Sequence, residues 1–259
     1  MSRLNTLKEK LANREPILST TISNLCWSGL VQKAATFPFD FMMFDLEHGT
    51  LSTESIEEML RICRLCDLPS VVRVADSVPH LISKTLDMGA DGILIPRVET
   101  LTQVETAVRC MRYYPRGRKG CGGFANFRAE DCGSVEIYND NRLLFVQIES
   151  GEGLQILPQL LTQYGPELAG IIIGPYDASI MLGTPFDIGS PEMLEYIGHV
   201  FDICRNYGIS CGSFVDDASL LARYQSLGAN VFWTGSEISL LCESYRLLCD
   251  TFAKTTETT

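Results

Sequence analysis

The hydrophobic positions along the chain form about eight short apolar runs, and segments with the helical spacing of apolar residues lie between them. Most of the runs are continuously apolar, as expected for strands that are buried on both faces of a parallel sheet. The expected strands are residues 16–22, 39–47, 70–74, 92–98, 143–149, 170–174, 209–214 and 231–235. This alternation predicts either a closed barrel or a doubly wound sheet.

The segments between the strands have the pattern of amphipathic helices, and several end in glycine, as helix C-caps do. They include SIEEMLRICRLC, VPHLISKTLDMG, TQVETAVRCMRYY, MLEYIGHVFDICRNYG and DASLLARYQSLG. No GxGxxG motif follows the first strand and no P-loop occurs, which argues against a doubly wound nucleotide-binding sheet. We therefore predict a (β/α)8 (TIM) barrel that forms a single domain over residues 1–259. The stretch 115–141 is too long for an ordinary connection, and we interpret it as an insertion or a subunit contact.

Composition and charge narrow the class of partner. The chain of 259 residues is 46% hydrophobic and 20% charged, which is typical of a globular protein. Its formal charge of −11 would be repelled by nucleic acid and by anionic membranes, so neither partner is expected. The sequence has no apolar run that could span a bilayer, and its polar start lacks the apolar stretch of a secretory signal. We expect a soluble, cytoplasmic protein.

Two further features leave their function open. The dense basic run of the chain is Arg112, Arg116, Arg118 and Lys119, which is either a solvated loop or an anion-binding or subunit-contact loop. The ten cysteines are spread through apolar helix and strand patterns, so reduced and mostly buried thiols are expected rather than a disulfide framework.

Polar residues lie at or just beyond the carboxyl ends of four of the expected strands, where a barrel places its active site. In chain order they are Asp45, Glu47 and His48, then Arg73, then Gln147 and Glu149, and then Asp177. Glu149 and Asp177 lie at the ends of neighbouring strands and could aim two carboxylates at one point, which suits Mg²⁺ or Mn²⁺. The pair could also be the acid and base of a hydrolase, but that interpretation gives Arg73 and Gln147 no reason to converge there.

The chemistry of Arg73 and His48 fits a reaction that passes through an anion. Arg73 offers a fork of donors for a carboxylate or an enolate oxygen, although it could instead pair with Glu47 or another barrel carboxylate. His48 could be a structural histidine, but the neighbouring Glu47 would orient its ring for a role as a base or proton shuttle. Every lysine falls in an expected helix, loop or terminus, so a Schiff-base aldolase is not expected and a metal must polarise the substrate carbonyl.

Seven segments carry a likeness to a known family, in that family's order and spacing: FDFMMFDLEHG, VVRV, LDMGADGILIPRVET, YPRGRKG, FVQIE, IIIGPYDASIMLG and VFWTGSEISLL. Together they resemble the HpcH/HpaI family of metal-dependent (class II) pyruvate aldolases over nearly the whole chain. The resemblance implies a lyase that cleaves 4-hydroxy-2-oxo acids to an aldehyde and pyruvate, through a pyruvate enolate, with a divalent metal such as Mg²⁺, Mn²⁺ or Co²⁺. It also implies a homo-oligomer, a hexamer built as a dimer of trimers.

The resemblance assigns roles to individual residues. It implies metal ligands at Glu149 and Asp177, substrate contacts at Arg73, Gln147, Tyr176 and Asp177, and catalytic residues at His48, Arg73, Asp45 and Asp87. Asp87 would reach the histidine of an adjoining subunit, but it could also be a surface helix charge. The backbone N–H groups of Tyr176 and Asp177 would hold the substrate carboxylate. The sequence departs from the family's usual residues at Val74, Tyr176 and Glu237, which puts the size of the substrate in question.

Two rival functions share the same expected site. One is a metal-dependent 2-oxo acid decarboxylase or a carbon–carbon bond-forming synthase. The other is a non-catalytic protein that keeps the site for binding a metal and a carboxylate, which the complete set of polar residues disfavours.

Overall fold

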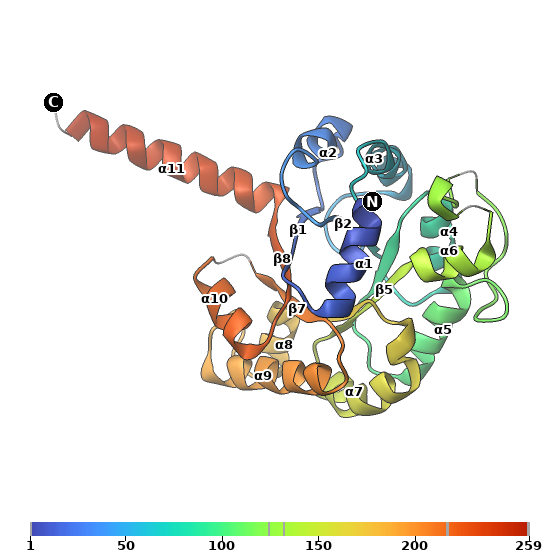
Figure 1. Cartoon of the computed structure of the whole chain (residues 1–259). Helices are drawn as coiled ribbons and strands as arrows, with labels where there is room; N and C mark the ends of the chain where they lie inside the picture. Colours follow the sequence, from blue (N-terminus) through green and yellow to red (C-terminus); the bar gives the residue numbers. More distant parts are fainter. Residues whose placement is uncertain (1, 124, 132, 216–217, 258–259) are drawn as a thin grey trace.

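The eight expected strands form one closed, parallel barrel in which each strand pairs with its neighbours in the sequence and β8 pairs with β1 (Figure 1). In this computed structural model, the residues described are 2–123, 125–131, 133–215 and 218–257. The strands are β1 (Ile17–Ile22), β2 (Phe41–Asp45), β3 (Ser70–Arg73), β4 (Gly92–Ile95), β5 (Leu143–Ile148), β6 (Gly170–Ile173), β7 (Cys211–Val215) and β8 (Val231–Ser236). The predicted (β/α)8 barrel is confirmed, whereas the division of residues 1–259 into domains stays a prediction.

Helices surround the barrel and connect its strands (Figure 1). They are α1 (Arg3–Asn13), α2 (Ser28–Ala34), α3 (Thr53–Leu65), α4 (Pro79–Asp87), α5 (Leu101–Met111), α6 (Val135–Asn141), α7 (Gly151–Tyr164), α8 (Pro175–Met181), α9 (Pro191–Asn206), α10 (Ala218–Leu227) and α11 (Glu237–Glu257), with short 3₁₀ turns η1 (Ala129–Asp131) and η2 (Gly165–Glu167). The expected helical patterns correspond to α3, α4, α5, α9 and α10. Among the described helices, none is long and apolar enough to cross a membrane.

The barrel interior is filled by apolar side chains, and α1 covers its amino end. Phe41 of β2 and Phe145 of β5 stack with ring centroids 5.9 Å apart. Leu4, Leu7 and Leu11 recur with helical spacing on one face of α1, and all three are buried in the same cluster as these rings. Each such leucine contributes about 1.5–3 kcal/mol by burial. The interior is therefore a packed core, and polar chemistry is confined to the ends of the strands.

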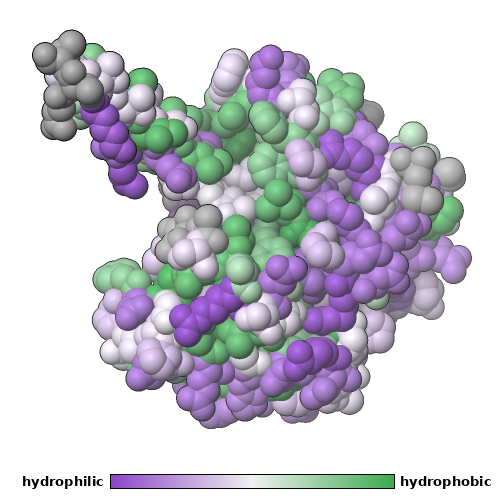
Figure 2. Space-filling view, turned by 60° about the vertical axis from the view of Figure 1, so that its left-hand side comes forward, coloured by the Kyte–Doolittle hydropathy of each residue, from purple (hydrophilic) through white to green (hydrophobic). Residues whose placement is uncertain are grey.

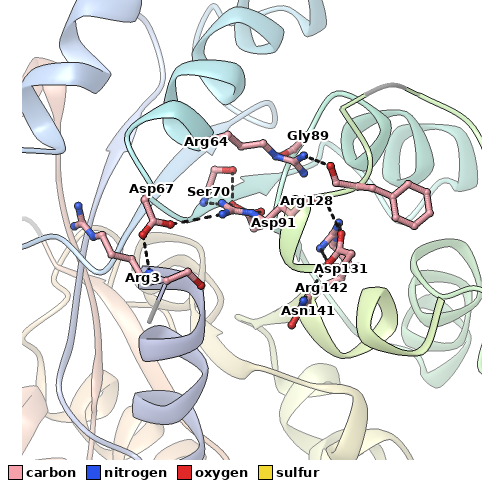
Figure 3. A network of polar contacts seen from close by, with 12 residues as sticks. Arg3, Arg64, Asp67, Ser70, Gly89, Asp91, Arg128, Asp131, Asn141 and Arg142 are labelled. Atoms are coloured by element: carbon pink, nitrogen blue, oxygen red, sulfur yellow. Dashed lines mark hydrogen bonds and ion pairs between the residues drawn. The ribbon is translucent and has the colours of Figure 1, made fainter. Parts of the chain in front are cut away.

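The stretch 115–141 packs on the amino end of the barrel through buried ion pairs (Figure 3). Arg128 donates to both carboxylate oxygens of Asp91, which directly precedes β4, at 2.5 and 2.6 Å. Arg142, directly before β5, binds Asp131 at 2.7 Å. Arg64 of α3 reaches the carbonyl of Phe127 at 2.9 Å. These contacts make 115–141 an anchored insertion that contains η1 and α6, and its role in a subunit contact stays a prediction.

Most side chains of the basic run 112–119 form ion pairs with acidic side chains and are not simply solvated. Arg112 and Arg116 bind Glu167 at 2.9 and 2.7 Å, and the buried Lys119 binds Asp87 at 2.5 Å. Three of its four cations therefore already have carboxylate partners, which leaves little charge for an external anion.

The cysteines of the described residues are free thiols, as expected, but the expectation that most are buried was wrong. Exposed thiols occur at Cys26, Cys121, Cys242 and Cys249. The last two lie on α11, where an apolar pattern is not followed by burial. Cys132 lies outside the described residues.

Candidate active site

A cavity of about 260 Å³ opens at the carboxyl ends of the strands, and it gathers most of the predicted site residues. It is lined by Thr21, Ser23, Asp45, His48, Arg73, Gln147, Gly174, Pro175, Tyr176, Asp177, Phe214, Trp233 and Ser236. Glu149 lies beside this cavity, next to Gly174. Asp87, by contrast, lines a different hollow with Lys84 and Met88 and is bound to Lys119. The chain thus brings together every predicted site residue except Asp87.

Arg73 is held at the end of β3 by two carboxylates of β2 and the turn that follows it. Its Nε and Nη2 donate to the two oxygens of Asp45 at 2.9 and 2.6 Å, and its Nη1 lies 3.3 Å from Glu47 Oε2. Its guanidinium also lies 5.0 Å from the ring centroid of Trp233. Burial opposes the charge of Arg73, but Asp45 and Glu47 outweigh it and raise the pKa of the guanidinium. The ion pairing of Arg73 with barrel carboxylates, which the sequence left open as an alternative role, is therefore present. It fixes a cation at the wall of the cavity.

Asp45 also shapes the turn that carries His48. Its Oδ1 accepts the backbone N–H groups of Glu47 and His48 at 3.0 and 3.2 Å, as in an Asx turn. The imidazole Nε2 lies 3.9 Å from Glu47 Oε2, and 64% of the His48 side chain is exposed. His48 therefore stands at the rim of the cavity, beside the carboxylate that the sequence suggested would orient its ring.

Glu149 directly follows β5, with only 4% of its surface exposed. Burial, together with the nearby negative charge of Asp177, raises the pKa of Glu149 to about 7. Gln147 Nε2 donates a hydrogen bond to Glu149 Oε2. A side chain at position 174 would collide with both groups, so the glycine that follows β6 makes the room for this carboxylate.

The two acidic groups leave negative charge that the protein does not fully balance. Arg73 lowers the pKa of Glu149 less than burial and Asp177 raise it. Among the described residues, no group of three or more histidine, cysteine, aspartate or glutamate side chains could hold a metal. Two carboxylates with further positions left for water or substrate suit a hard divalent cation that binds through few protein ligands.

Aromatic rings form one wall of the cavity, and two of them were not among the residues predicted from the sequence. The Tyr176 and Phe214 rings lie 6.3 Å apart, and Phe214 meets Trp233 edge to face at 5.2 Å. The Tyr176 ring is therefore part of this wall of the cavity. Phe214 at the end of β7 and Trp233 in β8 could have been found from their inward positions in the last two strands.

Comparison with known proteins places this chain in a family. The model of the HpcH/HpaI aldolase/citrate lyase family matches residues 24–244. The chain belongs to this family. A hydroxypyruvate/pyruvate aldolase of Roseovarius nubinhibens is 31% identical over 251 residues, which cover 93% of this chain and 94% of that protein. A 5-keto-4-deoxy-D-glucarate aldolase of Salmonella paratyphi C is 31% identical over 88% of this chain and 91% of its own.

Solved structures agree with the fold. The crystal structure of an HpcH/HpaI aldolase/citrate lyase family protein from Burkholderia cenocepacia superposes with a TM-score of 0.87 at 25% identity, covering 96% of this chain and 99% of that one. The family and the aldolases among its members make this HpcH/HpaI protein a lyase, as its sequence suggested.

Proposed function

We propose that this protein is a metal-dependent aldolase that cleaves 4-hydroxy-2-oxo acids to pyruvate and an aldehyde. The observation that carries the proposal is the buried carboxylate of Glu149 beside Asp177, in contact with a cavity that also holds the fixed cation of Arg73. Relatives named as hydroxypyruvate/pyruvate and 5-keto-4-deoxy-D-glucarate aldolases support the substrate class.

Glu149 and Asp177 are the proposed ligands of a divalent metal, Mg²⁺, Mn²⁺ or Co²⁺. Their oxygens are the donors that such ions prefer, and a bound cation would offset both the burial and the repulsion by Asp177 that raise the pKa of Glu149. When bound, the ion would polarise the keto group of a 2-oxo acid and offset developing negative charge.

The side chains around this position divide the remaining work. His48, oriented by Glu47, takes the proton of the C4 hydroxyl group, and the electron pair of the broken C3–C4 bond moves to the keto oxygen as an aldehyde leaves. Arg73 stabilises the resulting pyruvate enolate, and a proton returned to C3 yields pyruvate. Asp45 keeps Arg73 and the His48 turn in place.

The substrate itself is held by groups that surround the keto acid. Gln147 lines the cavity between Arg73 and Glu149, within reach of a bound 2-oxo acid. Tyr176 and Asp177 lie in the first turn of α8, and the N-terminus of a helix favours an anion such as a carboxylate. The aromatic wall that includes Tyr176 limits the size of the aldehyde or keto acid that fits.

We further propose that the protein works as a homo-oligomer, the predicted hexamer, with Asp87 acting across an interface. The long helix α11 supports self-association, because it extends away from the barrel (Figure 1). Its Leu247 and Phe252 are 68% and 69% exposed. An apolar groove of about 430 Å³ lies uncovered beside the first turns of α11. It is lined by side chains such as Ile22, Leu30 and Met42. Figure 2 shows hydrophobic surface on this helix and a hollow beneath it.

A second copy of the chain is the partner that fits both surfaces, because each copy offers one uncovered helix and one uncovered groove that a two-fold arrangement can cover together. Replacing Leu247 and Phe252 with aspartate should lower the mass measured by light scattering to that of a smaller species. A wild-type protein that is monomeric at micromolar concentration would refute this part of the proposal.

A retro-aldol screen tests the function directly. Purified protein is incubated with a series of 4-hydroxy-2-oxo acids, pyruvate is detected with a coupled dehydrogenase, and each reaction is repeated with a chelator. Pyruvate release that the chelator stops and Mn²⁺ restores is the expected result. Decarboxylation of oxaloacetate without any aldol cleavage would instead identify a decarboxylase, and binding of pyruvate without exchange of its methyl protons would identify a non-catalytic protein.

A further inference from the structure

Glu237, the first residue of α11, carries a carboxylate that is bound by three consecutive backbone N–H groups. Ser23 donates to Oε1 and Oε2 at 3.0 and 3.1 Å, and Asn24 and Leu25 donate to Oε1 at 2.6 and 2.9 Å. These amides belong to the segment 23–25, which follows β1 and has no regular secondary structure. Consecutive N–H groups that converge in this way form a concave anion site, and Glu237 fills it.

The carboxylate has a local reason to stay in this position. Only 8% of Glu237 is exposed, and none of the ion pairs among the described residues includes it. Backbone N–H groups are thus the donors that balance its charge. Hydrogen bonds to a charged acceptor are stronger than neutral ones, so the segment 23–25 is tied firmly to the start of α11.

The tied segment supports the turn that presents His48. Thr50 donates its backbone N–H to the carbonyl of Ser23 at 2.9 Å and its hydroxyl to the carbonyl of Asn24 at 3.3 Å. Gly49 has a φ of 98°, and a Cβ at this position would collide with the Ser23 carbonyl. The turn 48–50 and the segment 23–25 therefore pack with no space for a side chain between them.

His48 is consequently held from two sides. From the barrel, Asp45 accepts the His48 N–H at 3.2 Å. From outside, the chain of contacts runs from Glu237 through Ser23 to Thr50. Ser23 and His48 both line the cavity, so a shift of the segment would be transmitted to the rim where the imidazole lies.

We propose that Glu237 is a positioning residue for His48. Its carboxylate fixes the segment 23–25, and this segment fixes the turn 48–50 so that the imidazole stays over the cavity. The inference rests on the proposed role of His48 as the base of the aldol reaction. The sequence marked Glu237 only as a departure from the family's usual residue, and the contacts show what its carboxylate reaches.

Substitutions at Glu237 separate shape from charge. Glu237→Gln keeps the length of the side chain but replaces the charged carboxylate with a neutral amide. The amide has only one oxygen that can accept the backbone N–H groups. Glu237→Asp keeps the charge but withdraws it by one methylene. The matched control is Glu243→Gln, which removes one negative charge from an exposed position on the same helix.

The kinetic test measures kcat and KM for the substrate found in the retro-aldol screen. Glu237→Gln is expected to lower kcat by about 10- to 100-fold, the loss typical of a small misplacement of a catalytic group. KM should change far less, because the proposed metal ligands and Arg73 are untouched. Glu237→Asp should retain more kcat than Glu237→Gln, and Glu243→Gln should match the wild type.

A double-mutant cycle with His48→Ala shows whether Glu237 acts through the histidine. In the His48→Ala background, Glu237→Gln should cost less than about twofold further in kcat, because interacting residues are not additive. A full additional loss in that background would mean a general structural role and would overturn the proposal. Wild-type kcat in Glu237→Gln would overturn it as well.

Hydrogen exchange of the backbone keeps this inference separate from the proposed function. Faster exchange in residues 23–25 and 48–50 is expected in Glu237→Gln but not in Glu243→Gln, whether or not the wild type has aldolase activity. Unchanged exchange in residues 48–50 would show that the two segments are not coupled. An inactive wild type with altered exchange would reject the proposed function alone.

Discussion

The two ends of the barrel use buried charges in opposite ways. At the amino end, Asp91 is fully enclosed but faces Arg128, and the arginine outweighs burial and lowers the pKa of the carboxyl (Figure 3). At the carboxyl end, Glu149 is almost as buried but lies near another carboxylate, Asp177, and its pKa is raised to about 7. The protein thus compensates the buried charge of Asp91 with a cation, whereas the charge of Glu149 is not fully compensated.

This difference separates structural charges from charges that await a ligand. Burying a carboxylate is tolerated when a cation and hydrogen bonds compensate for lost water, as they do for Asp91 and Asp131. Glu149 has Gln147 as a donor and Arg73 nearby, but the net effect of its surroundings still favours the neutral acid. A site of this kind is stabilised by a cation, which is the property that the proposed function requires.

Breaking a matched pair at the amino end should have the largest effect. Arg128→Met leaves Asp91 buried without its cation, so the free energy of unfolding should fall by about 3–5 kcal/mol. Urea denaturation measures this loss, and Glu149→Gln serves as the comparison because it should not destabilise the metal-free protein. Similar losses in the two variants would show that both ends are structural.

Removing the cation at the carboxyl end should instead cost activity. Arg73→Ala should lower kcat by about 10²–10³-fold, which corresponds to about 2.7–4 kcal/mol of transition-state stabilisation. Arg73→Lys should also be strongly impaired, since an ammonium group cannot reproduce the two-pronged contact with Asp45. Turnover with the chelator-sensitive substrate measures both. Unchanged kinetics in either variant would remove Arg73 from the mechanism.

The pH dependence of stability gives a smaller and more specific contrast. Because the pKa of Glu149 rises from 4.5 to about 7 on folding, the unfolded chain releases a proton that the folded chain keeps between these values. The contribution of Glu149 to stability is therefore fully present below pH 4.5 and is lost as the pH rises to about 7. The loss is at most about 3 kcal/mol.

Urea midpoints at pH 4.5 and 8, measured with chelator, test this sign. The wild type should lose more stability over this interval than Glu149→Gln, which cannot ionise there. A variant with the same pH dependence as the wild type would mean that Glu149 does not carry the unmatched charge.

Strand ends were predictable from the sequence because apolar runs stop where polar residues begin. Asp45, Arg73 and Glu149 each end or follow a strand that the hydrophobic pattern located, and closure of the barrel brings them to one mouth. The period of the pattern determines which residues face the core, and the parallel topology determines which strand ends meet. Those two facts were sufficient to assemble most of the candidate site.

The parts that the sequence did not predict depend on contacts between distant backbone groups or on surfaces. The carboxylate of Glu237 binds three backbone N–H groups that lie more than 200 residues earlier in the chain, and no local pattern in the sequence predicts these contacts. The ion pair of Lys119 with Asp87 arises from the way 115–141 folds back. The sequence also did not predict that α11 is exposed, because the spacing of its apolar residues resembles that of a helix packed on its own barrel.

The central claim is that a divalent cation binds to Glu149 and Asp177, and calorimetric titration of the chelator-treated protein with Mn²⁺ tests it most directly. The wild type should bind one ion per chain, with affinity rising as the pH passes through about 7, because the ion must displace the proton of Glu149. Glu149→Gln should lose this binding, while Asp91, already matched by Arg128, should remain without metal. Equal Mn²⁺ affinity in the wild type and Glu149→Gln would contradict the account.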